Sequence, residues 1–234
     1  CASCERGVHI LDGHHTVKRD LCIACGECTD KCPTGALGLS SRELTKAEFI
    51  SIVNRQNRAF RENGGITFSG GEPLMRADLE KCGRAIYDRG FPWGMVTNGL
   101  AMTRRRFESL LAAGLHTATV SLDGLESDHN FMRGNAKSFT AASEAIRMMA
   151  QTEDFVFDVV SCVNRRNIDK LDDIKNHLLS LGCKQWRLFT VFPVGRAAED
   201  PELQLDREQF HKMLQYIADT RKEGKIAVQY GCEG

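Results

Sequence analysis

The chain has 234 residues, 42% of them hydrophobic and 26% charged, which suits one globular α/β domain with a small appendage. Its 31 basic and 31 acidic residues cancel, so charge favours neither a nucleic-acid partner nor a membrane surface. No run of 18 apolar residues occurs, which excludes a membrane-spanning helix. Because the chain begins at Cys1 rather than Met and stops at Gly234, we expect it to be a fragment cut at both ends.

Cysteines crowd the N-terminal part of the chain. Four of them, Cys22, Cys25, Cys28 and Cys32, spell C-x2-C-x2-C-x3-C and are followed by Pro33. This is the spacing of bacterial ferredoxins, in which tight turns direct successive thiolates to iron. In two-cluster ferredoxins the fourth cysteine ligates the other cluster, so the spacing does not say whether Cys32 binds the same cluster as the first three cysteines. Such spacing favours metal over disulfides, and we expect a reducing, cytoplasmic environment.

A second C-x2-C pair, Cys1 and Cys4, opens the chain. The mate of a two-cluster ferredoxin would need further cysteines where Gly7 and Leu11 stand. The alternative is that the pair supplies the last two ligands of a C-x3-C-x2-C cluster whose first cysteine precedes Cys1. Three protein ligands on a four-iron cluster leave one iron open to chemistry. Three isolated cysteines are expected to be small buried hydrophobes: Cys82, Cys162 and Cys183.

Helical periodicity begins after Leu44. Thr45 and Glu48 have the spacing of a capping box, and residues 63–65 are expected to end that helix. Beyond it, apolar strands alternate with amphipathic helices. Strands are predicted over 66–69, 93–97, 117–122, 155–163 and 185–191. Helices are predicted over 77–89, 103–113, 138–150, 168–181 and 206–222. Repeated βα units with short connections predict a parallel sheet, open or closed into a barrel.

Glycines and polar side chains follow the predicted strands. The first strand runs into Gly70, Gly71 and Glu72, where two glycines let a ligand approach the backbone and one carboxylate suits an ammonium group. The other strands are followed by Thr97–Asn98–Gly99, Ser121–Gly124, Asn164 and Pro193–Arg196. Asn98 and Asp123 are equally good turn formers beside their glycines. Five such loops at one sheet edge nevertheless predict a site there.

With these motifs the chain resembles the radical S-adenosylmethionine (SAM) superfamily. Phe68–Leu74 matches its Gly-Gly-Glu motif, the next two strand ends match its later motifs, and Cys1 and Cys4 fit the tail of its three-cysteine motif. The resemblance implies a partial (β/α)6 TIM-like barrel without its first strand, preceded by a small ferredoxin-like iron–sulfur segment. We expect that segment over 1–44, the barrel over 45–224 and the start of a C-terminal extension over 225–234.

The resemblance implies an enzyme with two or more [4Fe–4S] clusters and SAM as cofactors. A cluster on Cys1 and Cys4 would chelate SAM, and one electron would release a 5′-deoxyadenosyl radical that takes hydrogen from the substrate. Cys22, Cys25 and Cys28 would hold a cluster that relays electrons from an external flavodoxin or ferredoxin, and oxygen sensitivity implies an anaerobic host. The expected cofactor-binding residues are Gly70, Gly71, Glu72, Pro73, Thr97, Asn98, Ser121 and Asp123.

Two subfamilies fit the chain. The iron–sulfur insert followed by Gly64–Leu74 resembles glycyl-radical-enzyme activases. Ser121–Gly124, followed by His129 and Arg133, resembles the SPASM-type peptide- and protein-modifying enzymes, including anaerobic sulfatase maturases; Asn130 replaces their usual aspartate, and Cys232 would be the first ligand of their extension. We favour the SPASM type, and both imply a peptide or protein substrate. A non-catalytic ferredoxin-type electron carrier is the rival, but it leaves the strand-end loops unexplained.

Overall fold

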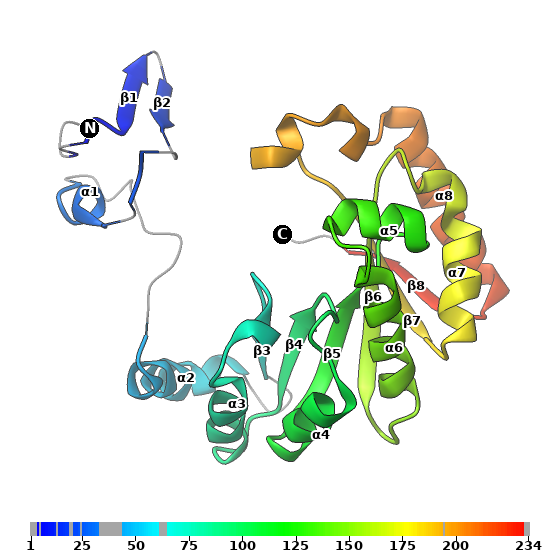
Figure 1. Ribbon diagram of the computed structural model, residues 1–234, viewed down its shortest axis with the longest axis horizontal. Helices are drawn as coiled ribbons and strands as arrows, with labels where there is room; N and C mark the ends of the chain where they lie inside the picture. Colours follow the sequence, from blue (N-terminus) through cyan, green and yellow to red (C-terminus); the bar gives the residue numbers. More distant parts are fainter. Residues whose placement is uncertain are drawn as a thin grey trace. The chain divides into compact units, whose positions relative to one another are not determined.

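The computed structural model describes residues 4, 6–12, 14–18, 21–23, 25–32, 44–60, 65–193 and 195–231 (Figure 1). The chain divides into two compact units, Cys1–Ser51 and Ile52–Gly234, and each is described by itself. Among the described residues, no helix combines the length and the apolar character needed to cross a membrane.

The described part of the N-terminal unit holds a β-hairpin, a short helix and the first turns of helix α2 (Lys46–Phe60). Strands β1 (His9–Asp12) and β2 (His14–Val17) pair antiparallel, with Ile10 opposite Thr16. Helix α1 (Glu27–Asp30) follows Gly26, whose φ of 84° is the left-handed conformation that glycine adopts without strain. This turn separates Cys25 from Cys28 in the ferredoxin-like run. The hairpin was not predicted, because its two four-residue strands are rich in histidine and lack a clear apolar alternation.

Six parallel strands form one sheet in the C-terminal unit, in the order β3-β4-β5-β6-β7-β8. They are β3 (Ile66–Phe68), β4 (Trp93–Thr97), β5 (Leu115–Ser121), β6 (Val156–Val163), β7 (Gln185–Thr190) and β8 (Ala227–Tyr230). Consecutive strands are neighbours throughout, which is the arrangement of a partial barrel and confirms the predicted fold class. Strand β8 was not predicted, because only Val228 of its four side chains is buried.

The helices that connect the strands cover one face of the sheet (Figure 1). They are α3 (Leu79–Tyr87), α4 (Arg104–Ala112), α6 (Ser138–Ala150), α7 (Leu171–Ser180) and α8 (Arg207–Glu223). Helix α2 (Lys46–Phe60) begins with the predicted capping box: Glu48 accepts the Thr45 backbone N–H at 2.7 Å and returns its own N–H to the Thr45 hydroxyl. The polar helix α5 (Glu126–Arg133) escaped prediction, because it buries only Asp128 and His129.

The core lies between the sheet and these helices. Alternate strand residues point into it, and Trp93, Met95, Trp186 and Leu188 are all fully buried. Each such side chain contributes about 1.5–3 kcal/mol of burial free energy. The indole N–H of Trp93 donates to the Ala113 carbonyl at 3.0 Å, and its ring lies against Gly83 of α3. A Cβ at Gly83 would stand 2.3 Å from that ring, so only glycine allows this approach.

We expect Gly83→Ala to destabilise the protein. Alanine would favour the helix by about 1 kcal/mol, but forcing a methyl group into a packed core costs about 1–3 kcal/mol. At a 2.3 Å separation from the Trp93 ring, the overpacking outweighs the propensity. Urea unfolding should therefore show a lower free energy of unfolding.

The control combines Gly83→Ala with Trp93→Phe, which replaces the indole by a smaller ring. The double variant should lose less stability than the two single variants lose together, since the smaller ring relieves the clash. A Gly83→Ala protein as stable as the parent would contradict this packing.

Candidate functional site

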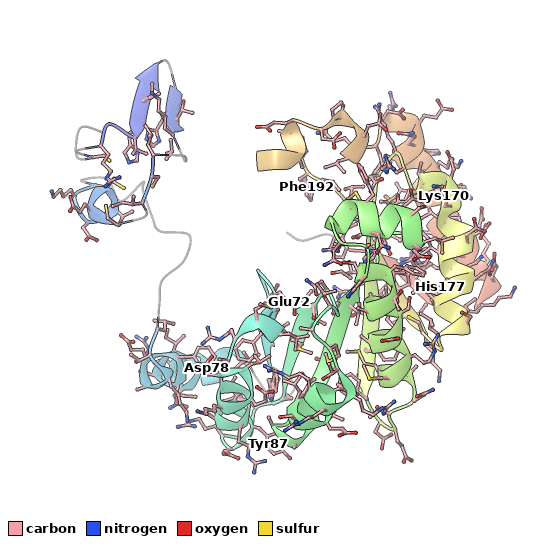
Figure 2. All side chains as sticks on the ribbon, in the orientation of Figure 1. Glu72, Asp78, Tyr87, Lys170, His177 and Phe192 are labelled. Atoms are coloured by element: carbon pink, nitrogen blue, oxygen red, sulfur yellow. The ribbon has the colours of Figure 1, made fainter. Side chains whose placement is uncertain are left out.

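Glu72 joins the loops that follow the first two strands of the sheet (Figure 2). Its carboxylate accepts hydrogen bonds from the Thr97 hydroxyl and the Asn98 backbone N–H, each at 2.7 Å, and from the Leu74 backbone N–H at 3.1 Å. Hydrogen bonds to an ionised acceptor are about twice as strong as neutral ones. The negative charge of Glu72 is therefore committed to holding the β3 and β4 loops together.

The two glycines before Glu72 leave open space beside their backbone. Gly70 and Gly71 have φ angles of 77° and 38°, and a Cβ on either would meet no atom within 4 Å. The backbone conformation, rather than crowding, is what requires glycine here. Pro73 follows as a buried residue that starts a short 3-10 helix, Pro73–Met75. A ligand can thus approach the chain directly at the predicted Gly-Gly-Glu motif.

The Asn98 side chain acts as a turn former, which was one of the two roles predicted for it. Its side-chain oxygen accepts the Leu100 backbone N–H at 2.9 Å, which makes it a turn former, while its own backbone N–H holds Glu72. Thr97 is buried, and its hydroxyl also accepts the Gly99 N–H at 3.1 Å. The β4 loop is therefore shaped by its own side chains and tied to the β3 loop.

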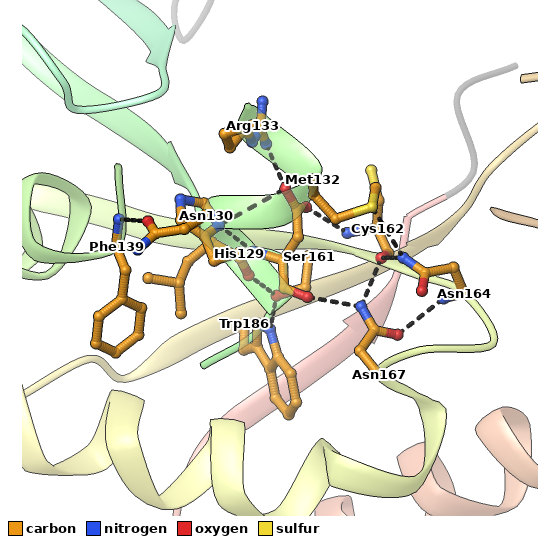
Figure 3. Close-up of polar contacts among 12 residues, drawn as sticks. His129, Asn130, Met132, Arg133, Phe139, Ser161, Cys162, Asn164, Asn167 and Trp186 are labelled. Carbon is orange, nitrogen blue, oxygen red and sulfur yellow. Dashed lines mark hydrogen bonds and ion pairs between the residues drawn. The ribbon is translucent and has the colours of Figure 1, made fainter. Parts of the chain in front are cut away.

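Asp123 is the centre of a buried polar network at the end of β5. Figure 3 shows polar contacts of its partners His129, Arg133 and Cys162. One carboxylate oxygen accepts the Cys162 backbone N–H at 3.0 Å, and the other pairs with the Arg133 guanidinium at 2.7 Å. The Asp123 backbone N–H donates to His129 Nδ1 at 3.0 Å. The predicted motif residues Asp123, His129 and Arg133 are thus brought together, and they join β5, α5 and β6.

His129 is held in one neutral form. Because Nδ1 accepts a hydrogen bond, the proton sits on Nε2, which is buried and has no partner among the described residues. Burial lowers the pKa of His129 to about 4, although the nearby Asp123 carboxylate opposes the shift. An uncharged imidazole therefore supports the Asp123 loop at neutral pH.

Two asparagines extend the network: Asn164, which was predicted at a strand end, and Asn167, which was not predicted. The Asn167 amide donates to the Asp123 carbonyl at 2.6 Å and to the Cys162 carbonyl at 2.9 Å. Its side-chain oxygen accepts the Asn164 backbone N–H at 2.8 Å. Both side chains are buried, so these bonds satisfy backbone groups that water cannot reach. An Asn-x-x-Asn spacing after a strand is the signal that could have revealed Asn167.

The contacts of Asn130 give a reason for asparagine at the position where the SPASM-type motif usually has aspartate. Its amide donates to the Ala136 carbonyl at 2.9 Å, and its oxygen accepts the Phe139 backbone N–H at 2.8 Å. An aspartate carboxylate accepts but cannot donate, so it would lose the first bond. The asparagine therefore serves the turn into α6.

The predicted cluster cysteines that the structure describes are not gathered around one point. Within its described part, no three His, Cys, Asp or Glu side chains lie close enough to hold a metal. The described thiols are exposed at Cys22 and Cys25 and half-buried at Cys4, Cys28 and Cys32, whereas Cys1 and Cys232 lie outside the described residues. The donor set itself suits iron, because it offers four thiols in eleven residues with a glycine turn between them.

The isolated cysteines differ from one another. Cys82 and Cys183 are buried as predicted, and burial raises the pKa of Cys183 to about 12, so it stays a thiol. Cys162 was expected to be buried but is half-buried, because it lies on the sheet face that the helices leave uncovered. The last predicted loop, Pro193–Arg196, falls partly outside the described residues, at Val194.

Comparison with known proteins identifies the family. The radical SAM superfamily model matches residues 28–178, which is more than half of the chain, and a 4Fe-4S binding domain model matches residues 15–38. The chain belongs to the radical SAM superfamily and carries a 4Fe–4S segment near its N-terminus.

Individual relatives are more distant. An "AdoMet-dependent heme synthase" of Methanosarcina barkeri is 29% identical over 216 residues, covering 90% of this chain and 58% of the relative. A second "AdoMet-dependent heme synthase", from Oleidesulfovibrio alaskensis, is 27% identical and covers 92% of this chain and 54% of the relative. The chain thus spans about half the length of these relatives. Streptococcus suis SuiB, solved with its precursor peptide SuiA, superposes with a TM-score of 0.64 at 16% identity, covering 84% of this chain and 44% of SuiB. That likeness concerns the fold alone.

We expect stability to fall in acid because of His129. Its pKa is about 4 in the folded protein and 6.5 in an unfolded chain, so between these values the unfolded state binds more protons. The free energy of unfolding should therefore decrease as pH falls from 6.5 towards 4, by up to about 1.4 kcal/mol per pH unit. Urea titrations across that range measure the slope.

The matched control is His129→Asn, whose side-chain oxygen can still accept the Asp123 N–H but cannot titrate. His177 has a pKa lowered by burial and by Arg147, so it contributes a slope of the same sign that this variant keeps. The variant should lose part of the pH dependence. An identical slope in both proteins would refute the role of His129.

Proposed function

We propose that the protein cleaves SAM reductively and uses the resulting 5′-deoxyadenosyl radical to take hydrogen from a substrate. The observation that carries this proposal is the open Gly70–Gly71 backbone, held beside Glu72, in a chain of the radical SAM superfamily. When bound, the clusters supply the electron and SAM supplies the radical. The barrel binds and orients them.

The contacts refine the roles expected of the site residues. Because Glu72 already accepts three hydrogen bonds, we propose that it acts on the SAM amino group by fixing the loops whose glycine backbone faces the ligand. Asp123 would act in the same way on the β5 loop, where Ser121 is half-buried at the strand end. Cys1 and Cys4 would hold the catalytic cluster, and Cys22, Cys25, Cys28 and Cys32 would supply thiolates for further iron. An external flavodoxin or ferredoxin would deliver the electrons.

We further propose that the substrate is a tetrapyrrole precursor of haem. The support is the pair of relatives named heme synthases, which match about nine-tenths of this chain. The sequence motifs had predicted a peptide or protein substrate, and these relatives are not named as peptide maturases. A peptide substrate remains the second candidate, favoured by the His129 and Arg133 motif after β5.

Anaerobic assay of the full-length, iron-reconstituted protein tests the reaction. With dithionite and SAM, the protein should release 5′-deoxyadenosine. It should consume an added tetrapyrrole carboxylate but not an added peptide. Complete absence of 5′-deoxyadenosine would sink the proposal. Consumption of a peptide alone would shift the substrate to the second candidate.

Glu72→Gln gives this assay a structural arm. All three groups that face the carboxylate are donors, so an amide would lose charge-assisted bonds worth about 1.5–3 kcal/mol each. We expect 5′-deoxyadenosine formation to fall at least about tenfold. Glu80→Gln is the control. Glu80 lies on helix α3, outside the proposed site, and its carboxylate pairs with Arg106 of helix α4 at 2.8 Å. Equal losses in the two variants would contradict the role of Glu72.

Iron analysis tests the N-terminal cysteines. Replacing Cys25 with alanine should remove about one cluster, or roughly four irons per chain, because one thiolate ligand is lost. Cys183→Ala should leave iron content unchanged, since Cys183 is a buried thiol in the C-terminal unit. Full iron retention in Cys25→Ala would refute a cluster on this residue.

A further inference from the structure

Three polar side chains meet on the sheet face that the helices leave uncovered. Arg187 of β7 donates from Nε to Asp158 of β6 and from Nη2 to the Thr119 hydroxyl of β5 at 3.0 Å. The Thr119 hydroxyl donates in turn to Asp158 at 2.6 Å. The three contacts form a closed ring, so the guanidinium is held in one orientation.

The strand register places Arg187 level with the proposed SAM site. Ser121 pairs with Val160, and Val160 pairs with Arg187, so the three lie in one row across β5, β6 and β7. Their neighbours along the strands, such as Trp186, are buried under the helices. Because side chains alternate between the faces of a strand, Arg187 and Ser121 share the uncovered face.

Arg187 keeps donors available there. A guanidinium has five N–H groups, and the two hydrogen bonds to Asp158 and Thr119 use two of them. The other N–H groups have no partner in the part of the chain that the structure describes. The Arg187 side chain is 37% exposed, against 15% for Asp158, so the cation is the accessible member of the pair. Phe189 is the next residue on this face, and the centroid of its ring lies 5.7 Å from the guanidinium carbon of Arg187.

We propose that Arg187 binds a carboxylate of the substrate while Phe189 packs against the apolar, planar part of the same molecule. An arginine fork matches the two oxygens of a carboxylate, and an aromatic ring suits a flat conjugated macrocycle. Asp158 and Thr119 position the guanidinium and do not touch the substrate. This inference rests on the proposed tetrapyrrole substrate and names the residue that recognises its acidic side chains.

Binding of two porphyrins tests it. Protoporphyrin carries two carboxylates, and its dimethyl ester has the same ring without the charges. Fluorescence titration of the full-length, iron-reconstituted protein should give tighter binding of the diacid. Arg187→Gln should weaken diacid binding about ten- to a hundredfold and leave ester binding unchanged, since a charge-assisted bond of this kind is lost.

Asp158→Asn separates recognition from a merely structural ion pair. Its oxygen can still accept the Arg187 Nε–H, but the charge that offsets the guanidinium is gone, so diacid binding should tighten about threefold or more. Arg84→Gln is the matched control, because Arg84 pairs with Asp88 at 2.9 Å and lies 5.7 Å from the Tyr87 ring on helix α3. This variant should bind both porphyrins like the parent.

The outcomes distinguish the two proposals. If the parent binds the diacid but Arg187→Gln binds it equally well, or if Asp158→Asn weakens binding as Arg187→Gln does, the assignment of Arg187 is overturned alone. If the parent binds neither porphyrin, the tetrapyrrole substrate and this inference both fail. Formation of 5′-deoxyadenosine would still stand as a separate test of SAM cleavage.

Discussion

The buried carboxylate of Asp123 makes the contacts on which the order of the strand-end loops depends. Removing a carboxylate from water is costly unless charge and hydrogen bonds replace the solvent. Here Arg133 supplies the charge and the Cys162 backbone supplies a donor, so α5 and β6 must both be in place for the β5 loop to form. Glu72 does the same for the β3 and β4 loops. The edge is thus ordered by the protein itself.

This order changes what the site residues offer a ligand. The two acidic side chains expected to touch SAM have their oxygens engaged by neighbouring loops. The parts left facing outward are the glycine backbone at Gly70 and Gly71 and the side chains of the uncovered sheet face. A preorganised edge of this kind can stabilise charge without rearrangement during reaction. Substrate choice then falls to groups such as Arg187 and Phe189.

Much of the fold could be predicted, because strong periodicity marks long elements. The strands of the sheet from β3 to β7, their connecting helices and the capping box at Thr45 were all expected. Short or polar elements were missed: α5 buries two polar side chains, and β8 buries one apolar residue. Cys162 was misplaced, because a lone cysteine in a strand pattern does not say which face it occupies. The predicted peptide substrate came from a motif that resembles that of peptide-modifying enzymes, whereas the relatives are named heme synthases.

By itself, the sequence determined the βα alternation, the glycine-rich strand ends and the cysteine spacing, since these depend on neighbours within a few positions. Only the tertiary structure decided that Glu72 and Asp123 are bound by other loops and that Arg187 faces the same side as Ser121. The physical reason is sequence separation. Thr97 lies 25 positions from Glu72, and Arg187 lies 68 from Thr119, so only the packing of the strands brings these groups within hydrogen-bonding distance.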